Sequence, residues 1–424
     1  MTKAIDGVAQ AKVIADRRFS FLANARKEAE RRGLFDVPVV DCDCHLYETT
    51  ALPEIARYID NPNIRRSFER SSLGMAMHAL LPGNLGDRTV SGRIKTELDM
   101  HLPTGQRTDI HPLAAGLLNS MDQMAIDYSV LFPTPMLTLG THPQPEFEIE
   151  LGRAYNHWLV RDVLPASHRI RTMAYLPLSD PDASVRVIEE FSEKAGVIGF
   201  MVTAVRYQPI HQNRFMKVFA ALNERRLPLA FHTGPNWTDR PFEQLNRFMS
   251  AHALGFPFYA MIQLTNIVLN GLPERFPELR FIYMEAGQAW VPFLMARLDN
   301  EYRQRSSEAP LLKRLPSDYI RDMYFTTQPF ERPDNAAQVQ AMFKLMDAEN
   351  RLLYSSDYPH QDFDLPAVIW DLPFLSETAK RKILGGNAIS LFNLPAPAAT
   401  APRSTSGGHQ VEGEPPGSHD AGFR

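Results

Sequence analysis

Short apolar segments alternate with helical segments along residues 37–394, and no other feature narrows the choice of fold as much. Strands that alternate with helices of about 10–15 residues form parallel βα units. Eight such units are the number that closes a (β/α)8 barrel, a fold of the α/β class. The eight predicted strands cover residues 37–43, 128–133, 172–177, 197–202, 228–232, 280–285, 323–326 and 351–355.

Three parts of the chain interrupt or flank this repeat. Residues 1–36 are rich in charged residues, and Gly33 near their end is a plausible C-cap. This pattern predicts a helical N-terminal extension. Residues 46–120 contain helix-like pieces and prolines without a strand pattern, so we expect an insertion after the first strand that could form a lid. Residues 395–424 have almost no large apolar side chains, which predicts a disordered tail behind a barrel domain of residues 37–394.

Composition narrows the class of partner. Of the 424 residues, 44% are hydrophobic and 22% are charged, and the net charge is −4, as in ordinary soluble enzymes. This charge gives no sign of a nucleic acid partner, and no apolar run is long enough to span a membrane. The two cysteines, Cys42 and Cys44, are too few for a disulfide framework. We therefore expect a cytoplasmic protein, without a signal peptide, that acts on a small molecule.

Residues that can bind metals or move protons stand at the ends of several predicted strands. Asp43 and His45 end the first strand and share one face of it, because strand side chains alternate. His232 ends the fifth strand, Glu285 ends the sixth, and Asp357 follows the eighth. The carboxyl ends of barrel strands surround the active site, so we expect these side chains to meet. Taken alone, the first strand could also end in ordinary solvated polar side chains.

Seven motifs resemble a known family, the amidohydrolase superfamily. Within it, the chain is most similar to the branch that holds aminocarboxymuconate-semialdehyde decarboxylase and γ-resorcylate decarboxylase, and the resemblance spans residues 37–393. The three most specific motifs are residues 43–45, 231–234 and 355–360. The other four, which mainly fix the register, are residues 131–134, 155–158, 274–280 and 290–292.

The resemblance implies a metal site and assigns its ligands. Asp43 and His45 would be the first-strand ligands, and His232 would be the fifth-strand ligand. Asp357 would be the eighth-strand ligand and would also accept a proton from bound water. Two imidazole nitrogens and two or more carboxylate oxygens suit Zn²⁺, and they also suit Mn²⁺ or Fe²⁺.

The sixth strand departs from the pattern of this family. Decarboxylases of the family commonly have a histidine followed by two glycines there, whereas this chain has Glu285 followed by Ala286 and Gly287. A glutamate could transfer protons if burial raised its pKa. It could also be an extra metal ligand or bridge two metal ions, and Asp41 or His252 could support the second ion.

Substrate contacts have weaker signals. Arg206 and His211 follow the fourth strand and could bind a substrate carboxylate, for which the arginine fork is well suited. A solvated pair of loop residues is the alternative. Trp237 and His252 lie in the long segment after the fifth strand, which we expect to be a loop, and they could line a pocket. We expect His360 to support Asp357 rather than to bind the metal itself.

The function expected from these features is that of a divalent-metal-dependent decarboxylase or hydrolase acting on a small carboxylated, often aromatic, substrate of catabolism. A second hypothesis is an oxygenase (hydroxylase) subunit that uses iron or manganese on the same barrel. A third is a metal-binding, non-catalytic subunit. By analogy with such barrels we expect a homo-oligomer, and the third hypothesis implies a hetero-oligomer with a paralogue.

Overall fold

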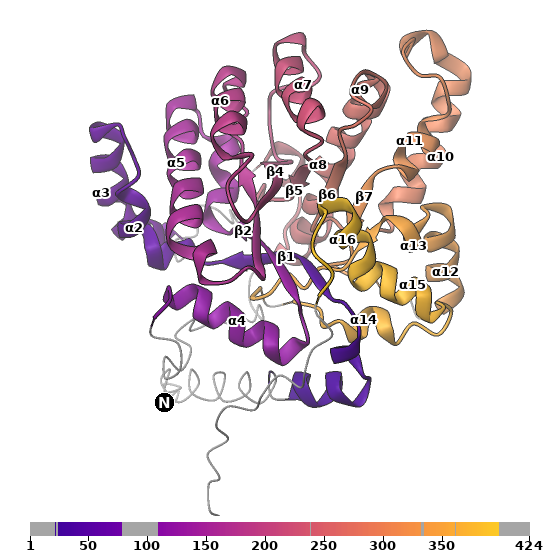
Figure 1. The fold of residues 1–424 in the computed structure, drawn as a ribbon. Helices are drawn as coiled ribbons and strands as arrows, with labels where there is room; N and C mark the ends of the chain where they lie inside the picture. Colours follow the sequence, from indigo (N-terminus) through magenta and orange to yellow (C-terminus); the bar gives the residue numbers. More distant parts are fainter. Residues whose placement is uncertain are drawn as a thin grey trace, which may run out of the picture.

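Eight parallel strands form one sheet in the order of the chain in the computed structural model (Figure 1). The structure describes Leu22 and residues 24–78, 109–237, 239–331, 335–360 and 362–397, with the backbone alone for 71–78. Every predicted strand is present, with ends displaced by at most three residues. The strands are β1 (Val40–Leu46), β2 (Tyr128–Pro133), β3 (Ile170–Tyr175), β4 (Val197–Thr203), β5 (Leu229–His232), β6 (Phe281–Met284), β7 (Tyr324–Thr326) and β8 (Leu352–Leu353).

The barrel closes between β1 and the segment that follows β8. The Cys42 amide donates to the Tyr354 carbonyl at 2.9 Å, and the His45 amide donates to the Tyr358 carbonyl at 2.8 Å. The Asp357 amide donates to the Asp43 carbonyl at 2.8 Å. This closure confirms the predicted (β/α)8 fold and places Asp357 directly beside the end of β1.

Helices surround the sheet (Figure 1), and buried apolar residues of the main helices join those of the strands in one core. In α6, for example, Asp180 accepts hydrogen bonds from the first turn, Pro181 occupies the first helical position, and Val187 and Phe191 are buried one turn apart. The main helices are α4 (Pro112–Met124), α5 (Pro145–Trp158), α6 (Pro181–Phe191), α7 (Met216–Arg225), α8 (Phe248–Leu269), α10 (Trp290–Arg305), α12 (Ala336–Leu345) and α16 (Asn387–Phe392).

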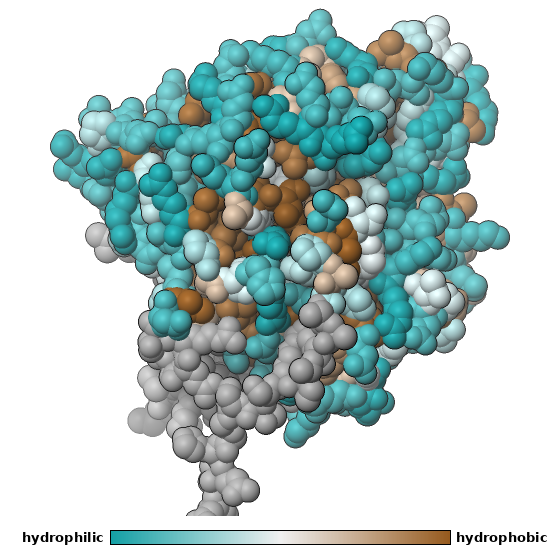
Figure 2. All heavy atoms as spheres, in the orientation of Figure 1, coloured by the Kyte–Doolittle hydropathy of each residue, from teal (hydrophilic) through white to brown (hydrophobic). Residues whose placement is uncertain are grey.

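The outside of the helical layer is largely hydrophilic in Figure 2, whereas apolar side chains gather near the centre of the face shown. This division matches amphipathic helices that turn their apolar faces inward. None of the helices in the described part of the chain is long and apolar enough to cross a membrane.

The helix after β5 is longer than the sequence pattern predicts. The segment that contains His252 is expected to be a loop, but α8 begins at Phe248 and continues through Pro257. His252 therefore lies on a helix, and its expected position in a loop is wrong. Proline usually interrupts a helix because it lacks an amide hydrogen. Here packing of the buried apolar residues of α8, such as Ala251 and Tyr259 on either side of Pro257, maintains the helix.

The three parts outside the repeat are described only in part. Residues 24–31 of the predicted N-terminal extension are helical. The insertion contributes η2 (Glu48–Ala51), α2 (Leu52–Ala56) and α3 (Pro62–His78), while residues 79–108 lie outside the described residues. Most of the expected tail, from residue 398 onward, also lies outside them. The lid and the disordered tail therefore stay predictions.

Candidate metal centre

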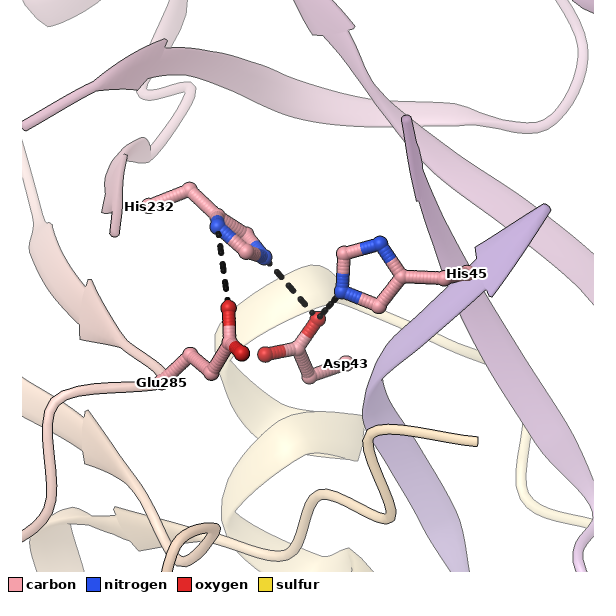
Figure 3. A group of neighbouring side chains, drawn as sticks. All are labelled: Asp43, His45, His232 and Glu285. Carbon is pink, nitrogen blue, oxygen red and sulfur yellow. Dashed lines mark hydrogen bonds and ion pairs between the residues drawn. The ribbon is translucent and has the colours of Figure 1, made fainter. Parts of the chain in front are cut away.

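Four buried side chains from three strand ends point toward one another at the carboxyl end of the barrel (Figure 3). Asp43 and His45 belong to β1, His232 is the last residue of β5, and Glu285 directly follows β6. One potential ligand atom from each of the four lies within 4.8 Å of the others. A cluster of this size can enclose a single metal ion.

Both imidazoles converge on the carboxylate of Asp43. His45 Nε2 and His232 Nε2 each lie 3.2 Å from Asp43 Oδ1, as the dashed lines in Figure 3 show. His45 Nε2 is also 3.2 Å from Asp357 Oδ1. Of the four ligands that the family resemblance implies, the fold groups Asp43, His45 and His232 in one cluster. It places Asp357 in an adjoining cluster with His45 and His360.

Three polar atoms of this cluster are buried without a hydrogen-bond partner, namely Asp43 Oδ2, Asp357 Oδ2 and His45 Nε2. An unpaired buried polar group costs about 1–3 kcal/mol, so proteins rarely keep several of them side by side. A divalent cation bound beside His45, the residue shared by both groups, would be a partner for such atoms. The donor set of imidazole nitrogens and carboxylate oxygens fits Zn²⁺, Mn²⁺ or Fe²⁺.

Backbone carbonyls orient both imidazoles as ligands. His45 Nδ1 lies 2.8 Å from the Pro133 carbonyl oxygen, and His232 Nδ1 lies 2.8 Å from that of Thr233. Because a carbonyl oxygen only accepts, each Nδ1 carries the hydrogen and each Nε2 presents its lone pair to the cluster. Burial opposes protonation of His45, but the carboxylates of Asp357 and Asp43 outweigh it and raise its pKa. A bound cation would take the place of that proton.

Asp357 is held at the barrel closure by His360. His360 Nδ1 lies 2.7 Å from Asp357 Oδ1, and its ring packs on His45 with centroids 4.2 Å apart. Burial opposes ionisation of Asp357, but the charge and hydrogen bond of His360, together with the nearby His45, outweigh it and lower its pKa. Asp357 is therefore an ionised carboxylate over a wide pH range, as a metal ligand must be.

Glu285 has the opposite tendency. Burial raises its pKa well above the ordinary range, and the nearby charges of Asp357 and Asp43 act in the same direction. The Thr233 hydroxyl donates to Glu285 Oε2 at 3.0 Å, and Glu285 Oε1 lies 4.0 Å from His360 Nδ1. Glu285 is thus a carboxyl group that can hold a proton on Oε1 next to the cluster.

Comparison with known proteins decides the family. Residues 40–394 match the family model for amidohydrolases. This chain belongs to the amidohydrolase family. The resemblance inferred from the motifs is confirmed, and so is the expectation of an enzyme of the metal-dependent decarboxylase and hydrolase class.

Relatives of this amidohydrolase include named decarboxylases. A γ-resorcylate decarboxylase of Rhodococcus jostii is 25% identical over 346 residues, which cover 77% of this chain and 99% of the relative. The structure of 5-carboxyvanillate decarboxylase from Sphingomonas paucimobilis has a TM-score of 0.61 at 21% identity and covers 85% of this chain and 100% of its own. A dihydroxybenzoic acid decarboxylase from Polaromonas, solved with bound manganese and 2-nitroresorcinol, has a TM-score of 0.58 at 18% identity and covers 84% of this chain and 97% of its own.

Arg206 of this amidohydrolase lies in a buried ion pair. It is 7% exposed, and its guanidinium contacts Glu148, which also accepts a hydrogen bond from the Tyr175 hydroxyl at 2.8 Å. The solvated-loop alternative is therefore wrong for Arg206. Glu148 already compensates its charge, so a role toward a substrate carboxylate stays a prediction. His211 is partly exposed, and its Nδ1 is buried without a partner.

Trp237 and His252 stack on each other, with ring centroids 5.6 Å apart. Phe256 packs on both rings, at 5.4 Å from Trp237 and 4.6 Å from His252, and Phe248 adds an edge-to-face contact with Trp237. These four rings join the segment after β5 to the first turns of α8. The structure brings the two predicted pocket residues together, and their contact with a substrate stays a prediction.

Asp41 does not join the metal cluster, although it belongs to the same strand. Its Oδ1 accepts from the Ser356 amide at 2.7 Å, and its Oδ2 accepts from the Ser356 hydroxyl at 2.5 Å. The pairing register of β1 with β2 shifts between Asp41 and Cys44, which breaks the simple alternation. The hypothesis that Asp41 supports a second ion is therefore wrong for this arrangement.

The sequence patterns did not reveal Glu48, a buried residue that supports the site from the side of β2. Its carboxylate accepts hydrogen bonds from the amides of Thr134 and Met136 at 3.0 and 2.8 Å. Thr134 Oγ1 in turn lies 3.4 Å from His45 Nδ1 and 3.4 Å from His360 Nε2. An acidic residue three positions after His45 was the available signal, but we assigned it to the insertion.

Proposed function

We propose that this amidohydrolase is a metal-dependent decarboxylase of a small aromatic carboxylic acid. The observation that carries the proposal is the buried cluster suited to a divalent cation, with the carboxyl group of Glu285 directed into it. The two parts together suit decarboxylation of an aromatic acid, because a cation can hold the carboxylate and an acid can protonate the ring carbon. The decarboxylase names and the aromatic substrates of the relatives support the proposal.

Asp43, His45, His232 and Asp357 would hold the ion, and Zn²⁺ is the ion that we propose. A divalent ion bound there would act as a Lewis acid toward the substrate carboxylate and an oxygen next to it. The same donors accept Mn²⁺, which the Polaromonas decarboxylase structure contains.

Glu285 would donate its proton from Oε1 to the ring carbon that carries the carboxylate. Thr233 occupies Oε2 through its hydroxyl, which leaves Oε1 as the protonated oxygen. The carbon–carbon bond then breaks, its electron pair returns to the ring, and carbon dioxide leaves. Glu285 would regain its proton from water before the next turnover.

Hydrolysis is the second candidate, and in it Asp357 would serve as the base that takes a proton from water. One observation favours it: His360 lies 2.7 Å from Asp357 and could receive that proton. The pKa of Asp357 is lowered, however, and a general base works best with a pKa near the working pH. A lowered pKa suits a ligand better than a base.

We also propose that Trp237 and His252 line the substrate pocket and that Arg206 and His211 contact the substrate.

We further propose that the protein is a cytoplasmic homo-oligomer. Helix α8 has no charged residue along its 22 positions. Leu254 and Ile262 on α8 are 55% and 38% exposed, and this uncharged apolar surface would suit a second copy of the chain. Light scattering should give a multiple of the chain mass, whereas a monomer that assembles only with a paralogue would favour the non-catalytic subunit.

The experiment that tests the function is a decarboxylation assay. Purified protein is incubated with dihydroxybenzoic and hydroxy-methoxybenzoic acids, and carbon dioxide and the decarboxylated phenol are quantified. We expect equal amounts of the two products from at least one acid. Carbon dioxide release that requires O₂, or a hydroxylated product, would instead support the oxygenase.

A further inference from the structure

The turn that carries Glu285 has an unusual backbone. Glu285 has a φ of 53° and Gly287 a φ of 70°, so two of three consecutive residues are left-handed. This conformation costs a non-glycine residue about 1–2 kcal/mol. Other contacts must therefore hold Glu285 in the position that directs its carboxyl group toward the metal cluster.

The carboxylate of Glu331 holds the far end of this turn. Glu331 belongs to the segment between β7 and α12, and its Oε2 accepts from the amides of Gln288 and Ala289 at 2.7 and 3.1 Å. These amides lie at the start of α10, where backbone N–H groups lack partners within the helix. A carboxylate placed there also interacts favourably with the helix dipole.

Residues at the end of β7 hold the rest of the turn. The Glu285 amide donates to Thr326 Oγ1 at 3.0 Å. The Gln288 side chain donates from Nε2 to the carbonyls of Thr326 and Thr327 at 3.0 and 2.6 Å. The turn is thus fixed at both ends, by Thr326 near Glu285 and by Glu331 near α10.

Gly287 and Glu331 are matched in shape. A Cβ atom added to Gly287 would lie 2.3 Å from Glu331 Oε1 and 2.7 Å from its Cδ. Real Cβ atoms do not approach other atoms so closely. A side chain at position 287 would therefore displace the Glu331 carboxylate, and the positive φ of this residue also favours glycine.

We propose that Glu331 is a positioning residue that holds Glu285 in its left-handed conformation, with the carboxyl group directed at the metal cluster. Its contacts at this turn are the amides of Gln288 and Ala289, which are peptide groups and not reacting atoms. The inference rests on the proposed function, because it gives Glu285 the role of proton donor.

The test is a double-mutant cycle with Glu331→Ala, Glu285→Gln and the combination of both. Glu331→Ala should lower kcat about 10–100-fold, the range typical of residues that orient a reacting group through another residue. KM and the metal content per chain should change less than about twofold. In the Glu285→Gln background the same change should have almost no further effect, because Glu331 acts only through Glu285. An equal loss in both backgrounds would overturn the inference.

Two variants control for a general loss of stability. Glu331→Gln keeps one acceptor oxygen and should recover much of the activity even if Glu331→Ala folds poorly. Asp299→Ala removes a similar carboxylate, which accepts from the Ser317 amide and hydroxyl at 2.9 and 2.8 Å, and should reduce stability without reducing kcat. A drop in kcat for Asp299→Ala as large as that for Glu331→Ala would contradict a specific role.

A crystal structure of Glu331→Ala separates this inference from the proposed function. We expect the Glu285 carboxyl group to move away from His232 while Asp43, His45 and His232 keep their positions. If Glu285 keeps its φ and its contact with Thr233, the inference is wrong. If the wild-type protein decarboxylates none of the acids, the proposed function fails, and this crystal structure alone decides whether Glu331 positions Glu285.

Discussion

Asp43 Oδ1 and His232 Nε2 lie 3.2 Å apart, although 189 positions separate the two residues in the chain. The parallel barrel explains this contact, because β1 and β5 both end at the same rim. His232 is the last residue of β5, Asp43 lies within β1, and both side chains are fully buried. Because His232 Nδ1 faces the Thr233 carbonyl, the lone pair on Nε2 faces the Asp43 carboxylate, and a cation bound to both atoms would make this contact favourable.

Replacement of the proposed acid should separate chemistry from metal binding. Glu285→Gln should lower kcat by about 10²–10⁴-fold, the usual contribution of a general acid, while the metal content stays constant. Steady-state kinetics and metal analysis of the same preparation provide the measurement. Glu278→Gln, a change of an exposed glutamate, is the matched control. Loss of metal from Glu285→Gln would show that Glu285 is a ligand instead.

Glu48 should make stability depend on pH. Burial raises its pKa from 4.5 to about 7, against the opposing effect of the Thr134 and Met136 amides. Between these two values the folded state binds more protons than the unfolded state, so the contribution of Glu48 to stability falls as the pH rises. Glu48→Gln cannot titrate. Its free energy of unfolding relative to wild type should therefore rise from pH 4.5 to pH 7 and then level off.

Urea denaturation of both proteins at several pH values, with excess chelator in every sample, measures this difference. The chelator removes the separate effect of metal binding on stability. A difference that is constant across the range would show that Glu48 has an ordinary pKa in the folded protein.

Gly255 should be intolerant of a methyl group although it lies in a helix. A Cβ atom there would lie 2.4 Å from Asn236 Oδ1 and 3.1 Å from the Trp237 ring. Gly255→Ala should destabilise the protein by about 1–3 kcal/mol, because overpacking outweighs the better helix propensity of alanine. Gly386→Ala is the control, since its nearest contact is 3.5 Å. Equal unfolding free energies of the two variants would contradict the close packing of α8 on Trp237.

The sequence allowed the strands, and the meeting of the side chains at their ends, to be predicted for a common reason, whereas the assignment of metal ligands came from the family resemblance. Strand periodicity places Asp43 and His45 on one face, and parallel connections bring His232 and Asp357 to the same rim. Both arguments use only local patterns and the topology that such patterns imply.

Contacts between distant segments could not be predicted in the same way. The partner of Arg206 is Glu148, 58 positions away, and no local pattern connects them. The turn after β6 depends on Glu331, which comes from a different βα unit. Asp41 follows the alternation of β1 in sequence, but the register shift turns it toward Ser356. Packing and register, which decide these cases, depend on the complete fold.

The most direct test of the account is the metal content of protein purified without added metal, measured by inductively coupled plasma mass spectrometry beside a His232→Ala variant. We predict about one divalent ion per chain, zinc or manganese, in the wild-type protein and a strong loss of it in the variant. About two iron or manganese ions per chain would favour the oxygenase hypothesis. An equal metal content in both proteins, or none in either, would contradict a metal site at Asp43, His45, His232 and Asp357.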